Sequence, residues 1–442
     1  MPAPSDLASQ VLFGLNPFWV SLAIFVATYA VIITERINRA VVALLGSGVM
    51  IASGVLTQET AIDAVDFNTL GLLTGMMVIV AVTRRSGVFQ YAAFWSAKRV
   101  RAHPVGILLM LAGVTTVFSA LLDNVTTVLL IVPVTLLICA ELKLKAYPYL
   151  VAEIFASNIG GTATLIGDPP NIMIGSAANL GFNDFLLNLA PVVPFILAAT
   201  LLVVLFIWRG ELRTSPEARQ RIMSVDEKRA ITDPRLLKQS LFVLALVMLG
   251  FTAGHGLHLQ PATVAMIGGA LLLLLYGFGH RPEDQSEKVQ ATFGEVEWIT
   301  IFFFVGLFIV VHGIERAGIL ALLAEHALAL TGGELATTAL AILWISAILS
   351  SLVDNIPFVA TMIPMIESMA PAFGGSEQLN PLWWSLALGA CLGGNGTLVG
   401  ASANLIVAGF AERAGQRIEF LKFALLAFPL MLLSILIASI YV

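Results

Sequence analysis

The sequence predicts an all-α polytopic membrane protein built from two inverted-topology repeats. Hydrophobic residues make up 58% of the 442 residues and charged residues only 12%, about half the charged share of a typical globular protein. Several apolar runs reach the roughly 17–25 residues that a helix needs to cross a bilayer. Two glycine-rich interruptions of apolar sequence, at 156–171 and 390–404, lie at matching places in the two halves. Each repeat is expected to hold about five crossings, a re-entrant hairpin and a discontinuous helix.

The first repeat is expected over residues 1–208 and includes an extra N-terminal span. Residues 1–16 carry no Lys or Arg, so they lack the basic segment of a cleavable signal peptide, and the apolar run 17–34 is interpreted as a retained span. The elements predicted after it are spans at 40–57 and 68–84, an amphipathic stretch at 88–101, a hairpin at 104–140, a broken helix at 149–178 and a span at 186–208.

A polar and basic segment, 209–237, separates the halves and is predicted to be a solvated cytoplasmic linker. The second repeat is expected over 238–442. Its predicted elements are spans at 238–257, 261–279 and 297–313, a mixed stretch at 316–331, a hairpin within 335–370, a broken helix at 382–410 and a final span at 419–441.

Internal duplication is the basis for the two-repeat prediction. At an offset of 231 residues, SALLDNVTTVLLIVP (119–133) aligns with SSLVDNIPFVATMIP (350–364). At an offset of 233, the glycines, threonine and asparagine of ASNIGGTATLIGDPPN align with those of ACLGGNGTLVGASAN. Paired, Gly/Pro-interrupted apolar segments of this kind point to the binding site of a transporter.

The distribution of Lys and Arg predicts the orientation, because cytoplasmic loops carry the excess of positive charge. With 209–237 in the cytoplasm and an odd number of crossings per repeat, 22 of the 23 Lys and Arg residues fall inside and only Arg316 falls outside. The chain is therefore predicted to be a multi-pass protein of the inner (plasma) membrane with both termini outside.

Three aspartates lie where the predicted helices break: Asp123, Asp168 and Asp354. An aspartate at the centre of a membrane helix costs about 2.5–3.5 kcal/mol on insertion scales, and such acids usually mark an ion or proton path. All three are candidates for proton coupling: Asp123 and Asp354 are symmetric, whereas a role of Asp168 would be one-sided, because its counterpart is Ala401. The alternative is that these carboxylates only cap the half-helices that follow them.

Polar and glycine residues at the breaks are expected to bind the substrate or ion. Amide and hydroxyl side chains offer both donors and acceptors, and glycines let backbone groups approach a ligand. These candidates are Asn124, Thr127, Asn158, Gly160, Gly161, Thr162, Thr164, Asn171, Asn355, Gly393, Gly394, Asn395, Thr397, Ser402 and Asn404. No Lys or Arg occurs in any predicted break, which favours a proton, a cation, a neutral hydroxylated solute or an anion escorted by cations.

Several other functions find no support in the sequence. It holds no nucleophile elbow, HExxH or P-loop pattern, and its six histidines lack metal-ligand spacing. We therefore expect no enzyme activity, no cofactor, no metal site and no nucleic-acid partner. Cys139 and Cys391 lie in apolar segments and predict no disulfide, and Glu153 and Glu367 are interpreted as packing residues.

Four segments together resemble a known family. LLDNVTTVLLIVPV, SNIGGTATLIGDPPN, LVDNIPFVATMIP and GACLGGNGTLVGASAN are similar to signature segments of the ion transporter superfamily. Within it they most resemble the ArsB/NhaD group of arsenite permease-like proteins, and especially the pink-eyed-dilution P protein branch. The resemblance implies secondary active transport by a transport domain of two hairpins and two discontinuous helices. Related divalent-anion/sodium symporters dimerise and move this domain as an elevator, which implies a homodimer here.

The resemblance supports several substrates. The first hypothesis is extrusion of arsenite or antimonite, as in arsenical resistance, driven by proton entry. The alternatives are a sodium/proton antiporter, a P-protein-like anion or solute pathway, and a passive channel. This chain departs from the related symporters, because an Asp precedes the Asn at both hairpin tips, at Asp123 and Asp354. That departure disfavours dicarboxylate transport and favours proton or cation coupling.

Overall fold

The computed structural model describes residues 11, 14–34, 36–254 and 259–442, and every element in this part of the chain is helical. The elements of the first half are α2 (Pro17–Thr34), α3 (Arg39–Ala52), α4 (Gln58–Asp63), α5 (Phe67–Arg84), α6 (Val88–Arg99), α7 (Pro104–Leu121), α8 (Asn124–Glu141), α9 (Tyr147–Gly161), α10 (Pro169–Ala178), α11 (Phe182–Asn188) and α12 (Val193–Trp208). His255 and His258, two of the histidines considered above, lie outside the described residues.

The linker and second half follow the same pattern of long helices separated by short connections. Their elements are α13 (Pro216–Ser224), η2 (Glu227–Ala230), α14 (Pro234–Gly254), α15 (Pro261–Gly277), α16 (Pro282–Phe293), α17 (Trp298–Arg316), α18 (Ile319–Leu330), α19 (Leu335–Leu352), α20 (Asn355–Glu367), α21 (Ala370–Phe373), η4 (Ser376–Leu379), α22 (Asn380–Gly393), η5 (Gly394–Gly396), α23 (Ser402–Arg413) and α24 (Phe420–Tyr441).

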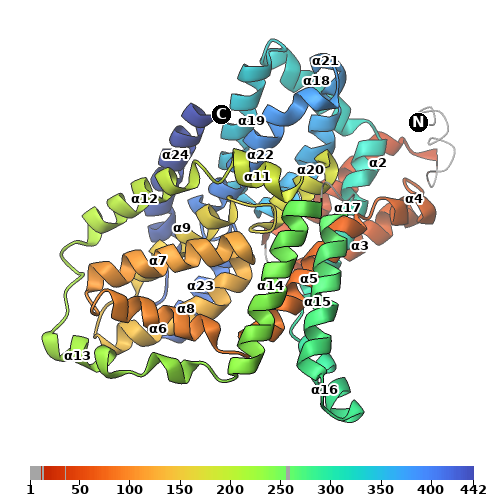
Figure 1. Ribbon diagram of the computed structural model, residues 1–442. Helices are drawn as coiled ribbons and strands as arrows, with labels where there is room; N and C mark the ends of the chain where they lie inside the picture. The colour runs from red at the N-terminus through yellow and green to blue at the C-terminus, as the bar shows by residue number, and fades with distance from the viewer. Residues whose placement is uncertain (1–10, 12–13, 35, 255–258) are drawn as a thin grey trace.

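The prediction of a polytopic all-α membrane protein is confirmed. Among the described residues, eight helices are long and apolar enough to cross a membrane, namely α2, α5, α7, α8, α14, α17, α19 and α24. Because the hairpin helices α7, α8 and α19 are themselves long enough to span, re-entrance of the hairpins stays a prediction. Figure 1 shows α13 and α16 at one end of the molecule, with α18 and α21 at the other.

One predicted span has a different form in the structure. The sequence predicts a single helix over 186–208, whereas α11 and α12 meet at an angle of 53°. Pro191 and Pro194 explain the bend, because proline disfavours the helical conformation in the residue before it and removes a backbone donor. The span predicted at 40–57 is also shorter in the structure, since α3 ends at Ala52.

Glycines allow two helix pairs to cross with their backbones in contact. A Cβ built on Gly75 of α5 would lie 2.5 Å from the carbonyl carbon of Ala265 in α15. A Cβ on Gly306 of α17 would also lie 2.5 Å from the carbonyl carbon of Ala43 in α3. Close crossings at small residues are typical of membrane helices. Gly75 and Gly306 are separated by the 231-residue offset of the duplication, so equivalent positions make equivalent contacts.

One face of the linker 209–237 packs on the helices, while most of its residues stay exposed to solvent. Ala218 and Ile222 of α13 are 2% and 1% exposed, because they pack against the membrane helices. Lys98 donates to Glu227 at 2.5 Å, and this hydrogen bond lowers the pKa of Glu227. The segment therefore forms a helical layer against α6 and α8.

Candidate transport site

The two hairpin tips and the two helix breaks converge on a small buried cavity. Its volume is about 20 Å³, which holds roughly one water molecule. Five of the candidate residues line it, namely Asp123, Asn124, Asp168, Asn355 and Ser402. Asp354 lies beside it and contacts Ser402 at 2.8 Å. The structure thus brings all three aspartates to one region.

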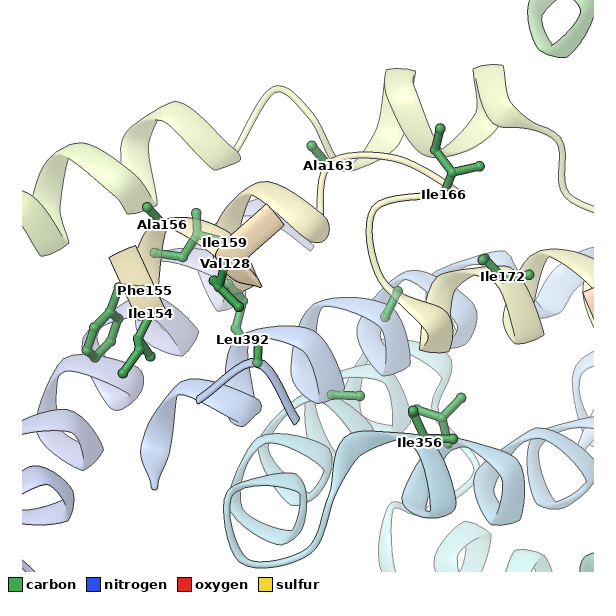
Figure 2. Packing of buried hydrophobic residues seen from close by; sticks show 14 of the residues in the cluster. Val128, Ile154, Phe155, Ala156, Ile159, Ala163, Ile166, Ile172, Ile356 and Leu392 are labelled. Atoms are coloured by element: carbon green, nitrogen blue, oxygen red, sulfur yellow. The ribbon is translucent and has the colours of Figure 1, made fainter. Parts of the chain in front are cut away.

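Apolar packing holds the first break in place. Figure 2 shows Ala163 and Ile166 on the extended segment between α9 and α10, and Ile172 on α10 itself. Ile356 of the second hairpin lies beneath α10 in the same view. All four side chains are at most 6% exposed, so the non-helical segment is buried within protein. Irregular backbone at membrane depth requires this kind of enclosure.

Asn171 and Asn404 close the two breaks from inside. Each sits in the first turn of the second half-helix and donates to carbonyls of the loop before it. Asn171 Nδ2 reaches the carbonyl oxygens of Gly161 and Thr162 at 3.3 Å and of Thr164 at 2.9 Å. Asn404 Nδ2 reaches those of Gly394 at 2.7 Å and Thr397 at 2.9 Å. These amides satisfy backbone groups that a broken helix leaves without partners.

A chain of amides connects both breaks to the first hairpin. Because Asn404 donates its Nδ2 to backbone, its Oδ1 must accept, and Asn158 Nδ2 donates to it at 2.9 Å. Asn158 Nδ2 also donates to Asn395 Oδ1 at 3.0 Å. Asn158 Oδ1 then accepts from Asn124 Nδ2 at 3.2 Å. The backbone carbonyls at one end therefore set the orientation of every amide in the chain.

Near this chain of amides, three buried polar atoms have no hydrogen-bond partner in the part of the protein that the structure describes. They are Asn124 Oδ1, Asn395 Nδ2 and Thr127 Oγ1. Buried polar groups normally find partners, because an unsatisfied group costs about 1–3 kcal/mol. Of these three residues, Asn124 lines the central cavity, whereas Asn395 and Thr127 lie outside its lining.

The remaining candidate residues contact the protein rather than the cavity. The three threonine hydroxyls donate to backbone carbonyls, Thr162 to Asn158 at 2.8 Å, Thr164 to Ala120 at 2.5 Å and Thr397 to Ser351 at 2.6 Å. Four glycines allow close backbone packing, with Gly160 against Thr116, Gly161 against Gly167, Gly393 against Ala347 and Gly394 against Gly400. These residues shape the site instead of lining it.

Asp123 and Asp354 both cap the helix that follows them. Asp123 accepts from the Thr126 amide at 2.6 Å and from its hydroxyl at 2.5 Å. Asp354 accepts from the Ile356 amide at 3.0 Å. The capping alternative considered from the sequence therefore describes one role of each. Asp354 has a second role, because it also binds a guanidinium.

That guanidinium belongs to Arg39 and corrects the expectation of a site without basic residues. Arg39 Nη1 lies 2.9 Å from Asp354 Oδ2 and 2.7 Å from Ser402 Oγ. Its guanidinium carbon also lies 4.9 Å from the centre of the Phe303 ring. The sequence argument failed because Arg39 is distant from every break along the chain and begins a different helix, α3.

Asp168 differs from the other two aspartates in lacking both a cap and a cation. Its side chain is 1% exposed and makes no capping bond to α10. Its carboxylate oxygens lie 3.3 and 3.4 Å from Asn355 Nδ2. Asp123 and Asp354 are close enough to repel its charge. The Asn355 amide and the Cys391 thiol that face this buried carboxylate are neutral, so its charge is poorly compensated when it is ionised.

Two further polar residues that line the cavity, Glu297 and Thr300, are not among the sequence candidates. Glu297 precedes α17, and Thr300 on the first turn of α17 donates to it at 3.2 Å. No signal in the sequence separates Glu297 from the acids of the neighbouring polar loop. Among the described residues, the His, Cys, Asp and Glu side chains form no group of three close enough to hold a metal ion.

We predict that Asn404→Asp destabilises the protein by about 2–4 kcal/mol, because two buried carbonyls lose their donor and face a new carboxylate oxygen. The substitution preserves size and the acceptor for Asn158. Asn183→Asp is the matched control, since the Asn183 amide donates near the surface to the Thr252 carbonyl at 2.8 Å. Thermal unfolding of the purified protein should show a large drop in Tm for the first variant only. Equal Tm values would show that Asn404 does not hold the break.

Comparisons with known proteins agree with this architecture. A family model described as a citrate transporter, CitMHS, matches residues 29–389. An uncharacterized transporter of Mycobacterium tuberculosis is 43% identical over 426 residues, covering 96% of this chain and 97% of the relative. The P protein of Sus scrofa is 32% identical over 521 residues, covering 99% of this chain and 61% of the relative.

A solved structure has a similar fold. The YdaH transporter of Alcanivorax borkumensis, whose topology is described as unusual, matches with a TM-score of 0.53 over 96% of this chain and 97% of that chain. The two sequences are 13% identical, so the likeness concerns the fold alone.

Proposed function

Because the chain belongs to the CitMHS family of membrane transporters, we propose that it is a secondary active transporter that couples movement of a small solute to protons. The observation that carries this proposal is Asp168. This carboxyl is buried at the convergence of both breaks and both hairpin tips, and it has neither a cap nor a cationic partner. Intramembrane acids of this kind commonly carry protons in transporters.

The first proposed cargo is arsenite or antimonite, extruded as a neutral trihydroxide, as in the ArsB group. The cavity of about 20 Å³ holds roughly one water molecule, so it would have to expand for either cargo, and by less for arsenite than for citrate. The unpartnered Asn124 Oδ1, which belongs to a residue that lines the cavity, is suited to accept a hydrogen bond from a hydroxyl group. An uncharged solute also needs no compensating ion at this depth.

The second candidate cargo is a citrate-like carboxylate. Arg39 supports it, because guanidinium groups are the preferred partners of carboxylates in proteins. The description of the family as citrate transporters supports it as well. A carboxylate would have to compete with Asp354 for Arg39, and the cavity would have to expand.

We also propose the two-repeat organisation, 1–208 and 238–442, with the linker in the cytoplasm and both termini outside. The equivalent crossings at Gly75 and Gly306 support the repeats. The matching roles of Asn171 and Asn404 support them too. Movement of the hairpins and broken helices as an elevator, within a homodimer, follows from the superfamily resemblance.

A flux panel in proteoliposomes tests the function. Purified protein is reconstituted, a pH gradient of about one unit is imposed, and uptake of arsenite, antimonite, citrate and Na⁺ is measured separately. One pH unit corresponds to about 1.4 kcal/mol, so a solute exchanged for one proton should accumulate about tenfold. Vesicles containing Asp168→Asn protein control for leakage of neutral solutes through lipid.

Each outcome selects a hypothesis. Gradient-driven arsenite or antimonite accumulation supports the first cargo, and citrate accumulation supports the second. Collapse of the gradient by Na⁺ alone would indicate sodium/proton antiport instead. Absence of gradient-driven movement for all four solutes would contradict proton-coupled transport of these classes.

A further inference from the structure

A second, larger cavity lies on the other side of Arg39. Its volume is about 310 Å³, and its walls are mostly apolar. Ile33 and Ile37, which line it, are 46% and 51% exposed, so the cavity reaches the surface of the protein. We call it the outer cavity because it lies nearer the protein surface than the small central cavity. Arg39 and Ser402 line both cavities. The two spaces are therefore separated by a partition that includes these two side chains.

The partition is held together by polar bonds between different elements. Arg39 Nη1 contacts both Asp354 Oδ2, at 2.9 Å, and Ser402 Oγ, at 2.7 Å. Ser402 Oγ in turn donates to Asp354 Oδ2 at 2.8 Å. These three groups form a closed triangle between α3, the second hairpin tip and the start of α23. Stacking on Phe303 of α17 positions the guanidinium.

We propose that Arg39 controls access to the central site, and that its triangle with Asp354 and Ser402 is the barrier between the outer and central cavities. Breaking the Arg39–Asp354 pair opens the barrier, because only one bond of Ser402, to Arg39 or to Asp354, then remains across it. The other charged groups facing the pair are Glu297, which attracts Arg39, and Asp168, which repels Asp354. Arg39 is thus a positioning residue whose charge decides whether solutes pass between the cavities.

Cysteine labelling tests this proposal. Val125 lines the central cavity, is partly buried and is close to Cys in size, so Val125→Cys places a thiol on the central side of the barrier. Its rate of reaction with a membrane-impermeant methanethiosulfonate is measured with the reagent applied to either side of the membrane. Protein without the substitution gives the background from Cys139 and Cys391, which are buried.

Arg39→Ala and Asp354→Asn should each raise the labelling rate about tenfold or more, the effect of losing a hydrogen bond to a charged group. A cationic and an anionic reagent are used in parallel. Opening the barrier raises both rates, whereas a mere change in local potential moves them in opposite directions. Asp354→Asn also retains the cap of α20, because Asn is a good N-cap, and it serves if Arg39→Ala does not fold.

Arg85→Ala is the matched control. Arg85 forms a comparable pair with Glu295 at 2.7 Å and lies 5.7 Å from the Tyr276 ring, away from both cavities. It should leave labelling of Val125→Cys unchanged. Unchanged rates in both Arg39→Ala and Asp354→Asn would overturn the proposal.

A barrier of this kind has a role only if the proposed transport function is correct, but the labelling experiment measures the barrier without any transported solute. If no solute moves in the flux panel but the barrier variants label faster, the proposed barrier is supported and only the proposed cargo is rejected. Normal flux with unchanged labelling would reject the barrier and retain the transporter.

Discussion

Replacing Asp168 with Asn is expected to abolish coupling to the proton gradient while leaving the protein folded. The side chain makes no cap, and it accepts from the Asn355 amide at 3.3 and 3.4 Å and from the Cys391 thiol. An amide of the same size can accept one of these bonds but cannot exchange a proton near neutral pH. Folding should be preserved, since the change also removes an acid that Asp123 and Asp354 repel.

The measurement is the accumulation ratio of the transported solute at several imposed pH gradients. The unsubstituted protein should reach about tenfold per pH unit and per proton, and Asp168→Asn should stay near unity at every gradient. Asp123→Asn is the matched control, because Asn preserves a helix cap as well as Asp does. Loss of coupling in Asp123→Asn with full coupling in Asp168→Asn would assign the proton to the first hairpin tip.

Replacing Gly160 with Ala is expected to destabilise the fold by about 1–3 kcal/mol or more. A Cβ at Gly160 would overlap the carbonyl oxygen of Thr116, and a Cβ at Gly393 would lie 2.6 Å from that of Ala347. Both obstacles are backbone atoms within helices, so neither can move without shifting α7 or α19. Gly393→Ala should therefore have a similar effect.

Thermal stability of the purified variants checks this prediction. Gly113→Ala is the control, because Gly113 lies in the interior of α7 and a methyl group added there would have nothing within 4 Å. Alanine is favoured over glycine in a helix by about 1 kcal/mol, so this variant should be neutral or slightly stabilised. A Tm for Gly160→Ala at or above that of the Gly113→Ala variant would show that the close approach carries no cost.

The long apolar elements can be predicted from sequence because each has a local signal. The interruptions at 156–171 and 390–404 coincide with the two broken helices, and the Asp-Asn pairs mark the ends of the hairpin helices. The bend between α11 and α12 escapes the hydropathy pattern although Pro191 and Pro194 signal it locally. Hydropathy averaged over a span is insensitive to two prolines among apolar neighbours.

The site can be predicted only in part, because side-chain partners depend on tertiary contacts. Local sequence locates Asp123, Asp168 and Asp354 at helix breaks. It cannot show that Arg39 reaches Asp354, which is 315 positions away. For the same reason, the sequence assigns Asn171 and Asn404 to ligand binding, whereas the structure has them bonded to their own loops.

Asn158 has a consequence for how the protein can move. Its amide bonds to Asn395 and Asn404 of the second break and to Asn124 of the first hairpin. It also belongs to α9, the first half of the other broken helix. One side chain thus connects three separate segments. Sliding of one break past the other would break these hydrogen bonds, so we expect the two breaks to move together against the surrounding helices.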